Sequence, residues 1–311
     1  MEKIFAMNKI FIDGSAGTTG LKIYERLVSR KDIQLITLSD ETRKDINARR
    51  DALNNADIAF LCLPDDAARE SVSLVSNPNT AVIDTSTAHR VNPQWTYGLP
   101  ELSGQREKIK SSKRIANPGC HATGFIALVA PLVEAGIIGE NEPLTCFSLT
   151  GYSGGGKKMI AQYEDVKRDS LLDAPRQYGL TQNHKHLPEM TQVSGLEVPP
   201  VFCPIVAPYY AGMEVTVSLN NKNIQAVKDC YADYYHDGVI RFAENSDEGG
   251  FISAGKFSGR DDLEISVFGN DERILLVSRF DNLGKGASGA AIQNMNILLG
   301  INETEGLEVR L

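Results

Sequence analysis

The sequence predicts an α/β protein with two domains, the first built on a doubly wound parallel sheet and the second on a mixed or antiparallel sheet. Short apolar strands alternate with helix-like segments through residues 9–86. The segment 57–64 is almost continuously apolar, which is typical of a strand in a sheet covered on both faces. After residue 120, longer strand-like segments follow with few helices between them. With 311 residues, of which 42% are apolar, the chain can bury one large core or two moderate ones.

The first part follows the order of a βαβαβ unit. A strand at 9–13 precedes a segment with apolar residues at Leu21, Tyr24, Leu27 and Val28, which is helical spacing. The same criteria predict further strands at 33–39, 57–64 and 80–86, separated by helices at 46–56 and 67–76.

The second part has strand-like segments at 144–154, 201–220, 263–269 and 273–283. The closing segment returns to helical spacing, with Ala290, Ile292 and Met295 among its apolar positions. Because this helix needs a sheet face to cover, we expect it to pack on the first sheet. The first domain is therefore predicted to be discontinuous, with residues 1–119 and 285–311 in one unit and residues 120–284 in a catalytic and oligomerisation unit.

A glycine-rich turn follows the first strand and stands directly before a helix. It places glycines at Gly14, Gly17 and Gly20. Glycines at such a turn allow the backbone to approach a pyrophosphate, which the helix N-terminus attracts. The turn therefore predicts a Rossmann-type dinucleotide-binding domain, although an ordinary glycine-rich turn would look similar.

The end of the second strand bears on the choice of cofactor. If that strand ends near Ser39, the following residues lie beside the adenosine ribose, and they include both acids (Asp40, Glu41) and bases (Arg43, Lys44). An acid there would hold the ribose hydroxyls of NAD, whereas a guanidinium would grip the 2′-phosphate of NADP. A solvated run of charges is the alternative. We expect NADP, held by Arg43.

One cysteine has a distinctive position. Cys120 follows Asn117-Pro118-Gly119 and precedes a long apolar run. At a helix N-terminus, unpaired backbone N–H groups and the helix dipole stabilise a thiolate, so we expect a lowered pKa and a nucleophile. The other cysteines lie in apolar strands or, for Cys230, in a helix-like segment, where buried hydrophobes are expected.

A thiolate needs a proton acceptor, and the segment 184–190 offers His184, His186 and Glu189. Alternate histidines on a strand or extended loop point to the same side, with Glu189 able to orient one ring. No third His or Cys ligand lies nearby in the sequence, so no metal site is expected. His121 adjoins the cysteine and is expected to face solvent.

A second glycine-rich segment, 151–158, ends in Lys157 and Lys158. Its backbone N–H groups and the lysines could cradle an anionic oxygen, and a flexible loop is the equal alternative. A nucleotide site, a helix-cap thiolate, a histidine and an anion cradle together suggest one reaction. It is the interconversion of an acyl phosphate and an aldehyde through a thioester.

Four motifs carry a resemblance to a known family: NPGCHATG, YGLPEL, HKHLPEM and the closing GASGAAIQNMN. They resemble N-acetyl-γ-glutamyl-phosphate reductase, and the opening IFIDGSAGTTGLKIYERL resembles its shorter subfamily. The resemblance covers nearly the whole chain. The family is similar in fold and chemistry to aspartate-semialdehyde dehydrogenase. Longer relatives usually carry Tyr-Pro where this chain has His121-Ala122.

The resemblance implies NADPH-dependent reduction of N-acetyl-γ-glutamyl phosphate to N-acetylglutamate 5-semialdehyde, with release of phosphate, in arginine biosynthesis. It implies Cys120 as the nucleophile and His184 as the acid/base, with the choice between His184 and His186 left open. Substrate contacts are expected from Tyr178, His186, Glu189, Gly155 and Lys157. Besides the glycines of the first turn and Arg43, we assign these residues to the cofactor site: Thr18, Thr19, Cys62, Pro64, Ser86 and Asn282.

Composition limits the other classes of function. A net charge of −8 and a pI near 5.3 argue against binding to nucleic acid. Five scattered cysteines without a CxxC pair fit free thiols in a reducing cytosol, so we expect a cytoplasmic enzyme. We also expect a homo-oligomer, as a dimer or tetramer. The N-terminal stretch 1–14 shows no signal-peptide pattern. The sequence contains no run of about 18 apolar residues, so we expect no membrane span. The alternatives are an aspartate-semialdehyde dehydrogenase, a lysine-pathway aminoadipyl-phosphate reductase, or a nucleotide-binding thiol redox sensor.

Overall fold

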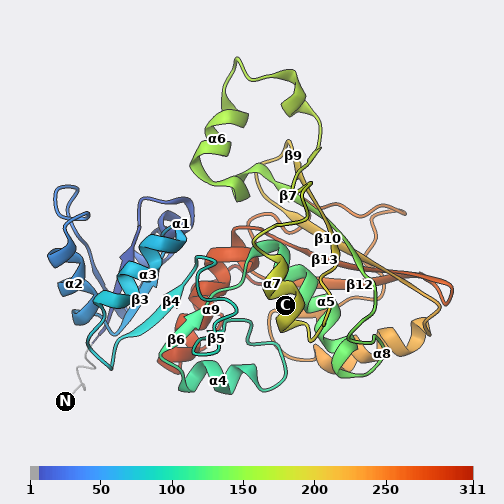
Figure 1. Cartoon of the computed structure of the whole chain (residues 1–311), viewed down its shortest axis with the longest axis horizontal. Coiled ribbons are helices and arrows are strands. Elements are labelled where there is room, and N and C mark those ends of the chain that lie inside the picture. The colour runs from blue at the N-terminus through green and yellow to red at the C-terminus, as the bar shows by residue number, and fades with distance from the viewer. Residues whose placement is uncertain (1–6, 311) are drawn as a thin grey trace.

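The computed structural model describes residues 7–310, which form two sheets with helices packed around them (Figure 1). Residues 1–6, which belong to the stretch without a signal-peptide pattern, and residue 311 lie outside the described part. Among the helices of residues 7–310, none is long and apolar enough to cross a membrane.

The first sheet has six parallel strands in the order β2-β1-β3-β4-β6-β5. The strands are β1 (Asn8–Asp13), β2 (Ile33–Ile36), β3 (Ile58–Leu61), β4 (Ala81–Asp84), β5 (Thr96–Tyr97) and β6 (Arg114–Ala116). The chain winds from β1 to β2 on one side and to β3 and β4 on the other, which defines a switch point at β1. Ligands of such sheets bind outside the carboxyl ends of the strands at this point.

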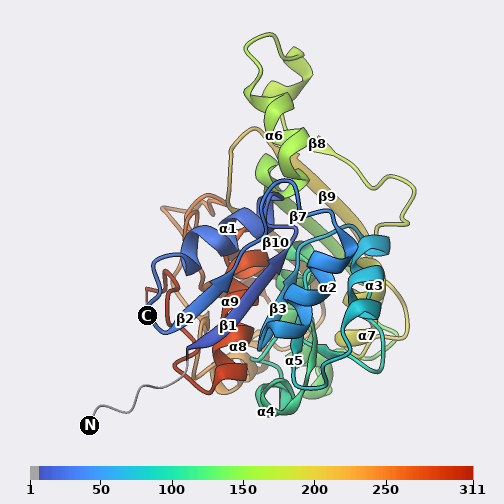
Figure 2. The same cartoon turned by 90° about the vertical axis from the view of Figure 1, so that its left-hand side faces the viewer.

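Helices cover both faces of this sheet (Figure 2). One face packs against α2 (Ile46–Asn55) and α3 (Asp65–Leu74), and the other against α1 (Thr18–Leu27), α4 (Gln105–Ser111) and α9 (Gly289–Leu299). Because neither face meets water, β3 and β4 are buried along their whole length. The doubly wound sheet expected from the sequence is therefore confirmed.

The second strand is shorter than the sequence suggested. β2 ends at Ile36, where its pairing with Phe11 ends, and not near Ser39. The backbone then turns, with the N–H groups of Thr42 and Arg43 both donating to the carbonyl of Ser39. The turn removes residues 37–39 from the ladder.

The closing helix α9 belongs to the core of the first sheet. Its Ile292 and Met295 are fully buried among residues of β1, β3 and α1. The π-helix η3 (Gly284–Ser288) precedes it, and there the fully buried Lys285 Nζ donates to Glu101 Oε1 at 2.7 Å and to Gln293 Oε1 at 2.6 Å. These contacts support the discontinuous first domain, whose boundaries remain a proposal.

The second sheet has seven strands in mixed orientation, in the order β11-β12-β13-β10-β7-β9-β8. They are β7 (Thr145–Gly151), β8 (Arg176–Gln177), β9 (Val201–Ala207), β10 (Met213–Asn220), β11 (Ile240–Phe242), β12 (Leu263–Asn270) and β13 (Arg273–Phe280). One face packs against α5 (Cys120–Glu134), α7 (Leu187–Val193) and α8 (Ile224–Tyr234). Since α5 is apolar on nearly all sides, it lies buried in this core.

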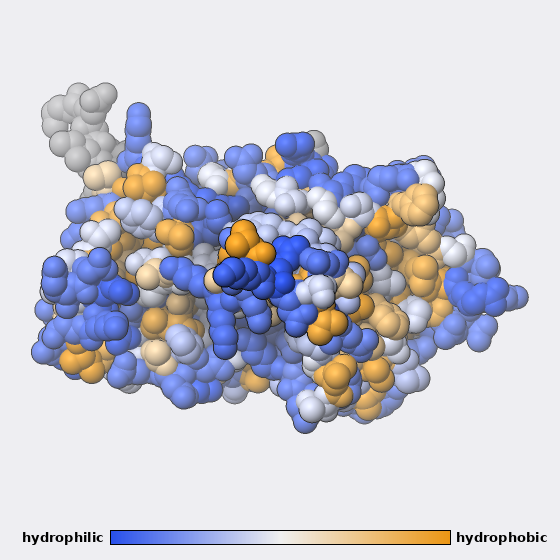
Figure 3. Space-filling view, turned by 90° about the horizontal axis from the view of Figure 1, so that it is seen from above, coloured by the Kyte–Doolittle hydropathy of each residue, from blue (hydrophilic) through white to orange (hydrophobic). Residues whose placement is uncertain are grey.

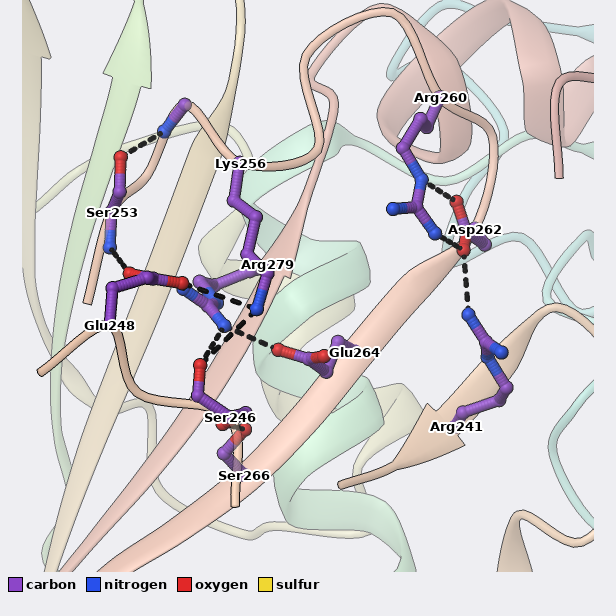
Figure 4. Close-up of polar contacts among 11 residues, drawn as sticks. Arg241, Ser246, Glu248, Ser253, Lys256, Arg260, Asp262, Glu264, Ser266 and Arg279 are labelled. Atoms are coloured by element: carbon purple, nitrogen blue, oxygen red, sulfur yellow. Dashed lines mark hydrogen bonds and ion pairs between the residues drawn. The ribbon is translucent and has the colours of Figure 1, made fainter. Parts of the chain in front are cut away.

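The opposite face of the second sheet is only partly covered. A loop, residues 243–259, lies over β12 and β13, and Figure 4 shows how charges attach it. The fully buried Arg279 of β13 donates to Glu264 of β12 at 2.5 Å and to Glu248 of the loop at 2.6 Å. Beyond the loop, Phe147, Val201 and Leu275 remain exposed on this face.

An arm projects from the second sheet, at the top of Figures 1 and 2. It comprises residues 152–179, with the 3₁₀-helices η1 (Tyr152–Gly155) and η2 (Ser170–Asp173), the helix α6 (Gly156–Glu164) and β8. Its small core contains Tyr163 and Leu172. Figure 3, which looks down on the arm, shows mostly hydrophilic residues at its tip.

Candidate active site

A cavity of about 410 Å³ opens between the two sheets. Its walls come from the carboxyl ends of β4 and β6, the N-termini of α1 and α5, the end of β7 with the glycine segment after it, and the segment before α7. The sequence-predicted residues on its walls are Thr18, Thr19, Cys120, Gly155, Tyr178, His184, His186 and Asn282. Residues from four distant parts of the chain therefore meet in one place.

Cys120 is the first residue of α5. β6 ends at Ala116, and Asn117-Pro118-Gly119 then turns the chain into the helix. No side chain caps this N-terminus, so its N–H groups remain available to the cavity. Burial raises the pKa of the Cys120 thiol, while the N–H of His121 and the charges of Arg90 and Lys185 act in the opposite direction. The lowered pKa expected from helix position alone is therefore wrong for this buried thiol.

Gly119 lets two side chains approach the cysteine turn closely. A β-carbon at this position would lie 2.4 Å from Arg90 Nη1 and 2.5 Å from His186 Nε2. Such distances are far below contact between these atoms. Glycine is therefore required for the guanidinium and the imidazole to sit against the backbone beside Cys120.

Arg90 anchors this turn from β4's side of the cavity. Its Nε donates to the carbonyl of Asn117 at 3.0 Å and its Nη1 to Glu189 Oε1 at 2.6 Å. The other oxygen of Glu189 accepts from Tyr97 Oη at 2.6 Å and from Gly119 N at 3.2 Å. Glu189 is thus bonded inside the protein on both oxygens. It orients Arg90 and the cysteine turn, and not a histidine ring as the sequence suggested.

The two histidines of the segment 184–190 lie in a turn and at the start of α7, not on an extended strand. Their ring centroids are 4.8 Å apart. The backbone N–H of His186 donates to Nδ1 of His184 at 3.2 Å, which places the proton of the neutral His184 ring on Nε2. Burial, with the charges of Lys185 and Arg90, lowers the pKa of His184 to about 4. The pKa of the buried His186 is also well below its usual value, first through burial.

His121 does not face solvent as expected. Only 3% of it is exposed, and it lies between the second sheet and the two histidines. Its Nδ1 is 2.6 Å from Ser148 Oγ and its Nε2 is 2.6 Å from Tyr178 Oη. The residue enters the site because it follows Cys120 in the first turn of α5, a helix that is buried from His121 to Leu132.

The anion cradle differs from the expected one in the source of its charge. Gly154, Gly155 and Gly156 line the cavity, but Lys157 is exposed and is not among the lining residues. Positive charge reaches the cavity instead from Arg90 and Lys185. An anion bound here would therefore meet a buried guanidinium and an ammonium group.

The cofactor side is built around the first glycine turn. Gly14 has a φ of +90°, and a β-carbon there would lie 2.3 Å from the carbonyl oxygen of Cys62. Gly17 precedes α1, Gly20 packs against Gly14, and the hydroxyl of Thr18 is buried without a hydrogen-bond partner within residues 7–310. An oxygen of a bound anion could accept from this hydroxyl and from the free N–H groups of α1.

A groove of about 760 Å³ continues from this turn along the end of β2. Arg43 and Lys44 line it together with Asp40. Arg43 Nε is 2.9 Å from Asp40 Oδ1, so the acid and the base of this turn pair with each other. The residues expected beside the adenosine ribose therefore share one groove.

The other residues assigned to the cofactor do not line the cavity or the groove, except Asn282. Burial raises the pKa of the Cys62 thiol to about 12, Pro64 precedes α3, and Ser86 Oγ donates to Asp84 at 2.7 Å. Asn282 lines the cavity, with its amide bonded to Gly212 N and Ser153 Oγ. Within residues 7–310, no group of three or more His, Cys, Asp and Glu side chains is arranged to hold a metal ion.

Sequence reasoning missed Arg90, Lys185, His121 and Ser148 as parts of the site. A signal for Arg90 was available, because it follows β4 and residues after the carboxyl ends of parallel strands face the ligand crevice. Lys185 stands between the two histidines that were chosen. Ser148 carries no local signal, since its partner His121 is brought to it only by the packing of α5 on the second sheet.

The fold and the site define a semialdehyde dehydrogenase. Residues 9–112 match the family described as "Semialdehyde dehydrogenase, NAD binding domain", and residues 120–282 match "Semialdehyde dehydrogenase, dimerisation domain". In structure, the chain is similar to aspartate semialdehyde dehydrogenase II from Vibrio cholerae, with a TM-score of 0.73 at 16% identity over 95% of this chain and 99% of that one. The corresponding enzyme with NADP from Candida albicans gives a TM-score of 0.65 at 16% identity, over 94% and 99% of the two chains.

Relatives of higher identity define the family more narrowly. N-acetyl-gamma-glutamyl-phosphate reductase 2 from Nostoc sp. is 45% identical over 96% of this chain and 99% of its own length. The N-acetyl-gamma-glutamyl-phosphate reductase of Sinorhizobium medicae is 45% identical over 94% of this chain and 98% of its own length. The chain belongs to the N-acetyl-gamma-glutamyl-phosphate reductase family, as its motifs indicated.

Proposed function

We propose that this protein reduces N-acetyl-γ-glutamyl phosphate to N-acetylglutamate 5-semialdehyde, with NADPH as reductant and phosphate as the second product. One observation carries the proposal. The thiol of Cys120 stands at the uncapped N-terminus of α5, in the same cavity as three histidines, two cationic side chains and the N-terminus of α1. A nucleophile, a proton carrier, charge for a phosphate and a dinucleotide site are what this reaction requires.

The residues of the first domain fit a pyridine dinucleotide. The unpartnered hydroxyl of Thr18 and the uncapped N-terminus of α1 suit the pyrophosphate, and Gly14 permits its close approach. Arg43 and Lys44, at the groove beyond this turn, suit a 2′-phosphate, which favours NADP over NAD. When bound, the reduced nicotinamide supplies the hydride that the reaction consumes.

The first half of the reaction transfers the acyl group to Cys120. The thiol loses its proton to an imidazole, for which we choose His184, and the sulfur attacks the acyl carbon. The bond between that carbon and the phosphate oxygen breaks, phosphate leaves, and a thioester remains. The raised pKa of the thiol disfavours the thiolate in the free protein. The charges of Arg90 and Lys185, and the N–H groups of α5, stabilise the thiolate and the developing oxyanion.

The second half reduces the thioester carbon. The resulting hemithioacetal oxyanion lies at the N-terminus of α5, where backbone N–H groups stabilise it until the C–S bond breaks. The aldehyde then leaves, and Cys120 regains the proton held by His184. Because the low pKa of His184 makes its protonated form a strong acid, this return is favourable.

We further propose that the chain functions as a homo-oligomer, as a dimer or tetramer. The open face of the second sheet exposes the large apolar side chains Phe147, Val201 and Leu275, which a second copy would cover. This face lies within the residues that match a dimerisation domain. Light scattering of the purified chain measures its mass in solution, and a monomer at micromolar concentration would refute this part of the proposal.

The reaction is tested most simply in the reverse direction. With NADP and phosphate present, N-acetylglutamate semialdehyde should be oxidised and NADPH should accumulate, and omission of phosphate should stop it. Aspartate semialdehyde serves as the matched substrate and should react at least tenfold more slowly. A preference for aspartate semialdehyde would contradict the proposed substrate. NADP reduction that does not need phosphate would contradict the proposal that the enzyme reduces an acyl phosphate.

A further inference from the structure

Three side chains form a hydrogen-bonded row from the interior of the second sheet to the cavity. The inner member is Ser148 of β7, which is fully buried. Its Oγ lies 2.6 Å from Nδ1 of His121, and Nε2 of the same ring lies 2.6 Å from the hydroxyl of Tyr178. Tyr178, at the base of the arm, lines the cavity beside Cys120. The row therefore ends next to the nucleophile.

The direction of the row follows from counting donors and acceptors. Burial lowers the pKa of His121 to about 3, so the ring is neutral near pH 7, with one N–H donor and one acceptor nitrogen. Within residues 7–310, the hydroxyl of Ser148 has no hydrogen-bond partner other than this ring. If Nδ1 carried the proton, the buried Ser148 hydroxyl would have no acceptor for its own, which is unfavourable.

In the arrangement that gives every buried hydrogen-bonding group of Ser148 and His121 a partner, Ser148 donates to Nδ1 of His121. The ring proton is then on Nε2 and is donated to the oxygen of Tyr178. The proton of the Tyr178 hydroxyl is left free, and no other described residue accepts it. Burial, and the nearby charge of Cys120 when ionised, raise the pKa of Tyr178 well above its usual value. The hydroxyl thus keeps its proton and points it into the cavity.

We propose that Ser148 and His121 are positioning residues that fix the Tyr178 hydroxyl as a hydrogen-bond donor to the acyl oxygen of the substrate held at Cys120. That oxygen gains negative charge as sulfur attacks, so a donor aimed at it contributes more in the transition state than in the ground state. The inference rests on the proposed function, because the acyl oxygen is that of the proposed substrate.

The inference is first tested on the protein without substrate. Nitrogen-15 NMR of the histidine rings distinguishes the two neutral tautomers, and the signals of His121 are assigned by their loss in a His121→Gln variant. We expect the proton on Nε2 between pH 6.5 and 8. A proton on Nδ1 would overturn the direction of the row, whatever reaction the protein catalyses.

The second test uses the reverse assay, once the wild type has been shown to turn over N-acetylglutamate semialdehyde. Tyr178→Phe should lower kcat by about 10²- to 10³-fold with little change in KM, as expected when one donor to an oxyanion is lost. Ser148→Ala should lower kcat by a smaller factor, about three- to tenfold, because the tautomer is no longer fixed. Tyr152→Phe removes a hydroxyl from the arm outside the cavity and serves as the control.

A double variant separates positioning from a general structural role. Because His121 acts only through Tyr178, His121→Gln should cost no further activity once Tyr178→Phe is present. If the activity losses of the two single variants multiply in the double variant, His121 does not act through Tyr178 and the inference is wrong. A Tyr178→Phe variant that changes KM alone would also contradict it. Thermal unfolding of each variant confirms that it is folded. If the wild type is inactive on the substrate, the proposed function fails, and with it the role of the acyl oxygen. The tautomer measurement still decides the direction of the row.

Discussion

Two helices direct their N-termini into the same cavity, and they differ in what surrounds their first residues. α1 begins at Thr18 after Gly17, α5 begins at Cys120 after Gly119, and neither is capped by a side chain. At α1, the first turn offers N–H groups and the Thr18 hydroxyl, which has no hydrogen-bond partner among residues 7–310. At α5, the first turn carries a thiol that is enclosed by a guanidinium and three imidazoles.

The difference separates binding from chemistry. An anion can be held by a glycine turn and a helix N-terminus, and these come from one continuous piece of chain. A thiol that must gain and lose a proton needs groups with tuned pKa values, and these reach Cys120 from the segment after β4, the arm and the segment before α7. Changes at α5 should therefore abolish turnover and spare cofactor binding, whereas changes near α1 should weaken cofactor binding first and lower turnover as a result.

The largest effect is expected from Cys120→Ser. A serine hydroxyl has too high a pKa to become the anion that α5 stabilises, so turnover should fall below detection. Cofactor affinity, measured by titration, should stay within about twofold, because α1 and its groove are unchanged. A serine variant that retains a tenth of wild-type turnover would contradict the assignment of the nucleophile. Iodoacetamide should label Cys120 of the wild type before Cys62 or Cys146.

Removal of α9 should instead disrupt the first domain, which contains α1 and the cofactor groove. A chain that ends at Gly284 loses Ile292 and Met295 from the core of the first sheet, together with the ion pair of Lys285 and Glu101. We expect it to be insoluble or unable to bind the cofactor. A chain that ends at Gly300 keeps α9 and is the control. A soluble, cofactor-binding product ending at Gly284 would argue against the discontinuous domain.

His184→Asn tests which histidine carries the proton for Cys120. Loss of the proton carrier should lower kcat by about 10²- to 10⁴-fold, with unchanged cofactor affinity. His186→Asn should mainly raise KM, and His236→Asn, at an exposed site outside the cavity, should have no effect. If His186→Asn is the more damaging to kcat and His184→Asn is nearly silent, the roles of the two rings are exchanged.

Arg43→Ala tests the cofactor groove beside α1, and its expected effect, on NADP affinity, is smaller. Charge-assisted bonds to a 2′-phosphate contribute about 1.5–3 kcal/mol, so NADP affinity should fall roughly ten- to hundredfold and NAD affinity should hardly change. Arg69→Ala is the matched control, since Arg69 is also exposed and paired with an aspartate, at 2.9 Å from Asp66, but lies outside the groove. Equal weakening of both cofactors would mean that Arg43 acts on structure, and a wild type that prefers NAD would overturn the cofactor choice.

The smallest effect is on stability in mild acid. The pKa of His121 is about 3 in the folded protein and near 6.5 when unfolded, so between these values the unfolded chain binds more protons. Stability should therefore fall as pH falls below 6.5, by up to about 1.4 kcal/mol per pH unit from this residue. The melting temperature of His121→Gln should depend less on pH between 6.5 and 4.5. Equal slopes would show that His121 is not buried in its neutral form.

The comparison of the two helices also explains what the sequence could predict. The βαβ alternation, the glycine turn and the turn before Cys120 depend on neighbours in the chain, and the order of their strands and helices was predicted correctly. The ends of β2, β3 and β4 were placed two or three residues too late. The surroundings of Cys120 depend on contacts between distant segments. Burial raises the thiol pKa, which helix position alone did not reveal, and Glu189 bonds Arg90 across 99 residues instead of a nearby histidine. Patterns of spacing carry no information on such partners.

The central claim is that Cys120 carries the acyl group between the two halves of the reaction. Mass spectrometry of the protein mixed with N-acetyl-γ-glutamyl phosphate, in the absence of NADPH, tests it directly. We predict one added N-acetylglutamyl group per chain, located on the peptide that contains Cys120 and lost when NADPH is added. A protein that turns over this substrate but accumulates no adduct, or carries it on another residue, would contradict the account.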